Sequence, residues 1–101
     1  MMLLTKANRK ALPALYSQDG KRGEAIAYVK FFDPTGSWTW YATEFDGEDT
    51  FFGVVQGFET GFGNFSLSEL QSVKGRFGLG IERDRYFDPT PLKDIVPELF
   101  T

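Results

Sequence analysis

Apolar and polar residues alternate with a period of two along three stretches of the chain, and this pattern predicts β-strands. The stretches are 25–33, 37–45 and 50–58. Asp33-Pro34-Thr35-Gly36 between the first two has Pro second and Gly fourth, as type I turns prefer. Asp46-Gly47 between the last two is a strong hairpin signal. The pattern therefore predicts an antiparallel meander, extended by a short strand at 61–67 and an edge strand or extended segment at 81–87.

Two short helical segments are predicted outside and within this meander. Thr5 can cap a helix that runs to about Leu12, because Pro13 disfavours helical geometry in the residue before it. Ser66 or Ser68 can cap a helical turn that continues to residue 73. The first helix precedes the sheet, and the second follows its fourth strand.

The C-terminal third predicts an irregular segment followed by a last helix. Residues 74–80 hold three glycines and should be irregular. Thr90 and Pro91 suit the N-cap and first position of a helix that runs to about Val96, since Pro97 limits it. The fold predicted is α+β, one domain over 1–101: an antiparallel meander of three to five strands with short N- and C-terminal helices packed on it.

The predicted strands are apolar on both faces. In a sheet with one face exposed to water, apolar and polar residues alternate along each strand. In the second strand, Trp38, Trp40, Ala42 and Glu44 are predicted on one face, opposite Thr39, Tyr41, Thr43 and Phe45. In the third strand, Gly53 and Gly57 indicate a bulge or a close approach by another element. The sheet needs a cover on each side, or it leaves one aromatic face for a ligand.

Composition excludes several classes of protein. The chain has no Cys and no His, which removes disulfides, thiol nucleophiles, Cys/His zinc sites and His general bases. A non-enzyme is therefore favoured, and no cofactor is predicted. No apolar run approaches the roughly 18 residues that span a bilayer, and the first residues lack a signal-peptide pattern. The predicted location is cytoplasmic, without membrane association.

Charge is divided unevenly along the chain. Residues 1–30 hold six bases and two acids, residues 31–70 hold seven acids and no base, and residues 71–101 hold five of each, which gives the net charge of −3. The simplest interpretation is that the basic N-terminal segment packs beside the acidic sheet. The functional interpretation is that the acidic surface attracts a basic partner and repels nucleic acid.

Three local patterns could carry chemistry, and each has a plainer structural explanation. Asp46, Glu48 and Asp49 could hold a divalent metal, but the spacing fails the EF-hand pattern, so a solvated hairpin tip is favoured and no metal site is predicted. The glycines at 57, 61 and 63, and at 75, 78 and 80, precede no clear helix, which favours turns over a phosphate loop.

The third pattern is the charged run 82–85. Alternation in a strand would place Glu82 and Asp84 opposite Arg83 and Arg85. A structural ion-pair network is the first interpretation, and an anion- or partner-binding role for Arg83 is the second.

Aromatic platforms in basic grooves bind single-stranded nucleic acid. Here the predicted strands of the meander carry aromatics with Lys30 as their one base, so electrostatics weigh against nucleic acid at the sheet. Most of these aromatics should fill the core, and about two of them suit an exposed partner-binding role.

Four segments resemble, in order, the domain-of-unknown-function 2958 family over nearly the whole chain: LLTKANRKALPALYS, KFFDPTGSWTWYATEFDGEDTFFGVVQGFE, GNFSLSELQSVKG and GLGIERDRYFDPTPL. The resemblance implies a bacterial protein associated with plasmids and other mobile elements, and it implies no activity or catalytic residue. The Gly-Pro that typically follows the SLSEL helix in that family is replaced by residues 74–77.

The function predicted is a non-enzymatic accessory or interaction protein of a mobile genetic element, monomeric or homodimeric, that engages a protein partner. One version is an anti-defence protein whose acidic face imitates the charge of DNA. The alternatives are a carboxylate-dependent enzyme, metal-assisted or not, and nucleic-acid binding through bases such as Arg9 and Lys10. The candidate partner-binding residues are Trp38, Trp40, Glu44, Asp46, Glu48, Asp49 and Arg83.

Overall fold

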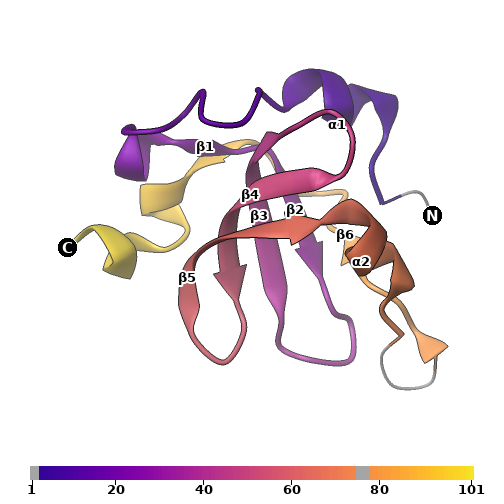
Figure 1. Ribbon diagram of the computed structural model, residues 1–101. Coiled ribbons are helices and arrows are strands. Elements are labelled where there is room, and N and C mark those ends of the chain that lie inside the picture. The colour runs from indigo at the N-terminus through magenta and orange to yellow at the C-terminus, as the bar shows by residue number, and fades with distance from the viewer. Residues whose placement is uncertain (1–2, 75–77) are drawn as a thin grey trace.

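A computed structural model describes residues 3–74 and 78–101, and its centre is a five-stranded antiparallel sheet (Figure 1). The strand order is β5-β4-β3-β2-β6. The bounds are β2 Val29–Phe32, β3 Thr39–Phe45, β4 Thr50–Gln56, β5 Thr60–Ser66 and β6 Glu82–Arg83. Strands β2 to β5 are neighbours in chain order, and β6 pairs with β2 at the edge. The α+β class, the meander and the edge strand are confirmed.

Two short α-helices begin where serine or threonine caps were predicted. Helix α1 spans Lys6–Ala11, and Thr5 and Asn8 exchange side-chain-to-backbone hydrogen bonds in a capping box. Leu12 is extended, as Pro13 requires. Helix α2 spans Leu67–Ser72, and Ser66 caps it by accepting from the Glu69 amide. Within the described residues, no helix is long and apolar enough to cross a membrane.

The first predicted strand is broken at Tyr28, and the predicted last helix is wrong at its start. Strand β1, Ile26–Ala27, leaves the large sheet and pairs with β7, Thr90–Pro91, in a two-stranded sheet. Tyr28 stays with the large sheet by donating its amide to the Ala42 carbonyl. Thr90 caps no helix, because Pro91 is extended and the next amide, Leu92, donates to Ala25.

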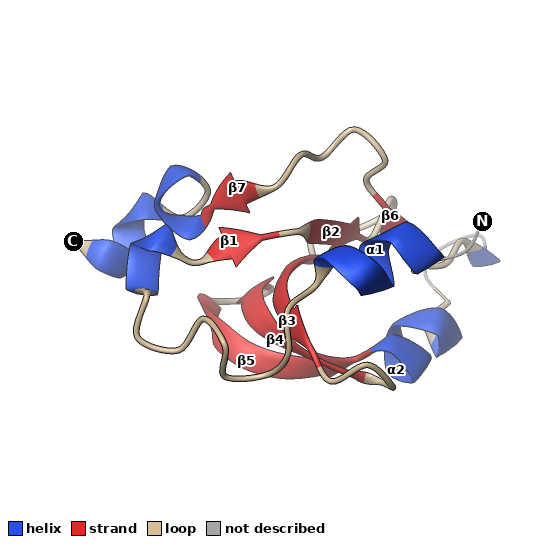
Figure 2. Cartoon of the chain, turned by 90° about the horizontal axis from the view of Figure 1, so that it is seen from above, coloured by secondary structure: helices blue, strands red, loops and turns tan. Residues whose placement is uncertain are grey.

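Short 3₁₀ helices replace the predicted C-terminal helix. They are η3 Leu92–Asp94 and η4 Pro97–Phe100, which lie near a third one, η1 Arg22–Glu24. Figure 2 shows these turns and the β1–β7 pair at one end of the molecule, while α1 and α2 lie at the other. Lys74 and Gly80 form an isolated β-bridge. The segment 74–80 is predicted to be irregular, and its residues 75–77 lie outside the described residues.

A β-bulge in β3 changes which side chains share a face. Ala42 pairs with Gly53, but the next pair is Glu44 with Phe52, so Thr43 is the additional residue. The predicted faces of Glu44 and Phe45 are therefore wrong, since strict alternation does not survive a bulge. The expected close approach at Gly53 is confirmed, because a side chain there would overlap the Tyr41 carbonyl oxygen.

Other segments of the chain pack on both faces of the sheet, which is one of the two alternatives that its two-sided apolar pattern allowed. On one face, called the first face, buried residues of the N-terminal segment and α2 pack on strands β2 to β4, including Leu4, Phe31 and Phe51. On the other, called the second face, Tyr41 and Val54 pack with the C-terminal segment through residues such as Leu92 and Val96. The candidate sites lie on these two faces, in the β3–β4 turn and beside β6.

Candidate functional sites

The predicted acidic hairpin tip is an ordered turn. One carboxylate oxygen of Asp46 accepts hydrogen bonds from the amides of Glu48, Asp49 and Thr50, at 2.8 to 3.0 Å. These amides lower the pKa of Asp46, because they stabilise its ionised form. Gly47 adopts φ +89°, the conformation that a glycine supplies at a tight turn. Asp46 therefore shapes the turn between β3 and β4.

Asp49 links this turn to helix α2. Its carboxylate accepts hydrogen bonds from the Ser66 hydroxyl and from both the amide and the hydroxyl of Ser68. The Ser66 hydroxyl is the largest cause of the lowered pKa of Asp49, followed by the Ser68 amide. Of the three predicted acids in the turn, two are therefore committed to local structure, and Glu48 is exposed.

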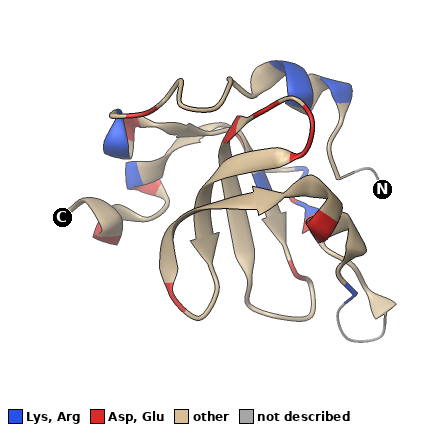
Figure 3. Cartoon of the chain, viewed as in Figure 1, with Lys and Arg blue, Asp and Glu red and all other residues tan. Residues whose placement is uncertain are grey.

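One N-terminal base packs against the acidic hairpin. The Arg9 guanidinium lies 5.5 Å from the centre of the Phe45 ring, and its Nη1 donates to the Gly47 carbonyl at 3.5 Å. Figure 3 shows the basic residues of α1 beside the acidic β3–β4 turn. The interpretation that the basic N-terminal segment packs beside the acidic sheet is supported here by a cation–π contact and a backbone contact.

Glu44 is buried and fixes the loop that follows α1. Its side chain lies on the second face because of the bulge, and the residue is 4% exposed. Oε1 accepts from the Tyr16 amide at 2.8 Å, and Oε2 accepts from the Gln18 amide at 2.9 Å. Tyr16 adopts φ +70°, a strained conformation for a tyrosine, which these bonds help to hold.

Gln18 completes the attachment of this loop. It is buried, and its Nε2 donates to the carbonyls of Ile26 and Thr43, at 2.9 and 2.7 Å. Its Oε1 accepts from the Ile26 amide at 2.7 Å. Gln18 thus connects the loop between α1 and η1 to the backbone of two strands, at Ile26 of β1 and Thr43 of β3.

A cavity of about 530 Å³ lies between this loop and the second face, and we call it the sheet–loop cavity. Its lining combines apolar side chains with a few polar ones. The apolar residues are Leu15, Ala25, Phe52, Phe62 and Leu92, and the polar ones include Gln18, Thr43, Glu44 and Asn64. Size and composition match those of small-molecule sites.

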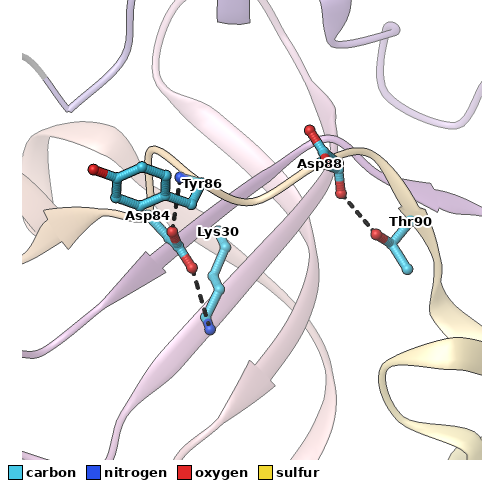
Figure 4. Close-up of polar contacts among 5 residues, drawn as sticks. All are labelled: Lys30, Asp84, Tyr86, Asp88 and Thr90. Atoms are coloured by element: carbon cyan, nitrogen blue, oxygen red, sulfur yellow. Dashed lines mark hydrogen bonds and ion pairs between the residues drawn. The ribbon is translucent and has the colours of Figure 1, made fainter.

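A second, shallower hollow of about 350 Å³ surrounds the charged run 82–85. Asp84 forms an ion pair with Lys30 of β2 at 3.6 Å and accepts from the Tyr86 amide at 2.9 Å, as Figure 4 shows. In the same view Thr90 donates to the Asp88 carbonyl. Arg83 lies opposite Phe31 in the β2–β6 ladder and lines the hollow.

The predicted tryptophans lie together on the first face, at the end of the sheet opposite the acidic turn. Trp38 and Trp40 have ring centres 6.0 Å apart, and Trp38 meets Phe58 edge to face at 5.5 Å. Both tryptophans are half-buried, while Phe58 is 95% exposed. We call Trp38, Trp40 and Phe58 the aromatic end. In Figure 1 the strand ends joined by the β2–β3 and β4–β5 turns extend beyond the helices.

The acids proposed for a carboxylate enzyme lie in three separate places. Glu44 is in the sheet–loop cavity, Asp46, Glu48 and Asp49 are in the β3–β4 turn, and Glu82 is on β6. Among the described residues there is no group of three or more His, Cys, Asp or Glu that could hold a metal ion. Asp46 and Asp49 share one turn, but the carboxylates of both accept hydrogen bonds from local structure.

Sequence reasoning missed the cavity and the exposed ring of Phe58. The cavity has no sequence signal, because it lies between a loop and residues far along the chain: Glu44, which the loop contacts, is 28 residues after Tyr16 and 26 after Gln18. Phe58 does have one, since an aromatic residue between Gly57 and Glu59 in a turn is hard to bury.

Comparison with known proteins identifies one relationship. The family model described as "Protein of unknown function (DUF2958)" matches residues 3–94 of the 101-residue chain. Comparisons with curated proteins and with solved structures found no match. The matched segment contains every strand of the large sheet, the aromatic end and all the residues named in the sheet–loop cavity.

Proposed function

The chain belongs to the DUF2958 family of proteins of unknown function, and we propose that it is a non-enzymatic interaction protein that engages a protein partner through the aromatic end. The observation that carries the proposal is the 95% exposure of Phe58 against a tryptophan ring. Large aromatic side chains dominate the energetics of protein interfaces, and burying an exposed one is a strong driving force for association.

The two tryptophans of the aromatic end are held in place by packing. The Trp38 ring lies directly over Gly57, where any side chain would overlap it. Trp40 packs against the core of the first face, and its ring centre lies 6.0 Å from that of Trp38. Because these two rings are already positioned, they would lose little conformational entropy when a partner binds.

Charge indicates the kind of partner. No Lys or Arg occurs in residues 31–70, and Glu59 is exposed and follows Phe58 in the sequence. An apolar surface with an exposed carboxylate beside it suits a partner that presents an apolar pocket bordered by Lys or Arg. The proposed interface therefore combines a hydrophobic centre with charge complementarity at its edge.

A version of this function in which the acidic face imitates the charge of DNA has less support than docking of a partner on the aromatic end. A DNA mimic needs many free carboxylates on one face, whereas Glu44 is buried and Asp46 and Asp49 are occupied by local hydrogen bonds. The accessory role in a mobile element rests on the family resemblance, and we retain it as part of the proposal.

The two alternative functions are a carboxylate-dependent enzyme and a nucleic-acid-binding protein. The dispersed carboxylates give no support to a carboxylate-dependent enzyme. Nucleic-acid binding through the N-terminal segment would use Lys6 and Lys10, which are exposed on α1, and Arg9, which already contacts Phe45. Charge reversal at Arg9 and Lys10 with no loss of DNA retention would remove that alternative.

A photo-crosslinking amino acid tests the proposed surface directly. It replaces Phe58 in one variant and Tyr86 in a control, since Tyr86 is 88% exposed but lies beside β6 at the other edge of the sheet. In cells that carry the natural gene, position 58 should yield a discrete crosslinked protein that position 86 does not. The same products from both positions, or none from position 58, would contradict the proposal.

A further inference from the structure

We propose that the sheet–loop cavity binds a small organic cation, in which a protonated amine or guanidinium is attached to an apolar body. The site lies on the second face of the sheet, whereas the aromatic end lies on the first, so this inference does not depend on the proposed partner. Three features carry it: the buried carboxylate, the aromatic wall and the charge of the lining.

The carboxylate of Glu44 retains capacity for a cationic ligand. Each of its oxygens accepts one amide hydrogen bond, whereas an ionised carboxylate offers about four lone-pair sites. The ion pairs found among the described residues join Lys30 to Asp84 and Lys93 to Glu24, so neither neutralises Glu44. A buried carboxylate is costly unless it is paired, and a cation in the cavity would supply the missing charge.

Two rings give the cavity an aromatic wall. Phe52 and Phe62 lie side by side on adjacent strands, with ring centres 6.0 Å apart and planes only 7° from parallel. Ring faces attract ammonium and guanidinium groups and also pack against apolar groups. Leu15, Ala25 and Leu92 add apolar surface for the body of the ligand.

The charged residues of the lining favour a cation over an anion. Gln18 makes three hydrogen bonds with the backbone, which leaves its amide little capacity for a ligand. Asp19 and Arg22 are exposed and carry opposite charges, so Glu44 gives the lining a net charge of −1. An anionic ligand would meet this uncompensated carboxylate and be repelled.

The volume limits the size of the ligand. A cavity of about 530 Å³ is within the range of roughly 300 to 1,000 Å³ that holds drug-sized molecules. An amine with one aromatic ring fits easily, and so does the side chain of an arginine presented by a peptide. These two sources share one chemistry, and the experiment separates them.

Matched small probes test the charge preference. We would titrate the ¹⁵N-labelled full chain with 2-phenylethylamine, 2-phenylethanol and phenylacetate, and follow amide chemical shifts by NMR. The amine should bind at least about tenfold more tightly than the alcohol, since a charge-assisted bond is worth roughly twice a neutral one. Shifts should centre on the amides of Tyr16 and Gln18. N-acetyl-arginine methylamide binding at the same amides would identify a peptide side chain as a source; failure of this probe beside amine binding would identify a free amine.

Two variants keep the test independent of folding. Glu44→Gln removes the charge but can also loosen the loop, so Phe62→Ala serves as the second variant, because Phe62 is 48% exposed. Phe62→Ala should weaken amine binding at least about fivefold, and Phe58→Ala on the first face should leave it unchanged. Equal binding of amine and alcohol, shifts centred away from the cavity, or no binding of any probe would overturn the proposal.

Discussion

At the scale of single residues, chemically similar acids have different roles because their surroundings differ. Glu44 is buried and holds a loop, Asp46 closes a turn, and Asp49 holds the start of α2. Glu48, two residues beyond Asp46, is exposed. The sequence predicts an acidic segment here, but it does not show which carboxylates are occupied, since that depends on amides contributed by other segments.

Replacing Glu44 should loosen the loop that follows α1. In Glu44→Gln one of the amides of Tyr16 and Gln18 loses its acceptor, and the change should lower the free energy of unfolding by about 2 kcal/mol. The matched control is Glu48→Gln, which alters an exposed side chain and should stay within about 0.5 kcal/mol. Urea denaturation of both variants measures the difference. Equal stability of the two would contradict the structural role of Glu44.

Asp46 and Asp49 should make the fold less stable in acid. Their folded pKa values are lowered from 3.8, so the unfolded chain binds more protons in the acid range. Their stabilisation is present above the unfolded pKa and is lost as pH falls through the folded pKa, from about pH 5 downward. In Asp49→Asn the fall in stability between neutral pH and about pH 3 should be shallower, as measured by urea midpoints. A slope identical to that of the parent protein would contradict this assignment.

At the scale of secondary-structure elements, local signals predict the strands and caps well. The turns at 33–36 and 46–49 and the N-caps at Thr5 and Ser66 depend on neighbouring residues, and all are present. The segment 90–96 differs from these. Its Thr-Pro start suits the beginning of a helix, but in the structure the Leu92 amide donates to the Ala25 carbonyl instead. A partner that is 67 residues away in the sequence overrides the local preference.

The bulge in β3 depends on a glycine in the neighbouring strand. Gly53→Ala would push a methyl group into the Tyr41 carbonyl oxygen and should destabilise the fold by about 3 kcal/mol or more. Gly63 pairs with Gly53 across the sheet, and a methyl group there would have no other atom within 4 Å, so Gly63→Ala should change stability by less than about 1 kcal/mol. Thermal unfolding of the two variants measures this contrast. A similar loss in both would contradict the role of the close approach.

At the scale of the whole molecule, the covers on the two faces determine where a ligand or partner can bind. The N-terminal segment and α2 cover part of the first face, and the C-terminal segment covers part of the second. The apolar pattern of the strands predicts either two covers or one aromatic face left for a ligand, and the tryptophans are among the predicted contact residues. The free areas could not be predicted, because the path of the loops over the sheet is set by long-range contacts such as those of Gln18 and Glu44.

Binding of a protein partner by the aromatic end is tested most directly by the dissociation constant of the complex. Once crosslinking has identified the partner, binding is measured for the parent protein, Phe58→Ser and Tyr86→Ser. We predict that Phe58→Ser raises the dissociation constant at least about tenfold, since exposed aromatic anchors dominate interfaces, while Tyr86→Ser leaves it unchanged. Unchanged binding in a correctly folded Phe58→Ser variant would contradict the proposed role of the aromatic end.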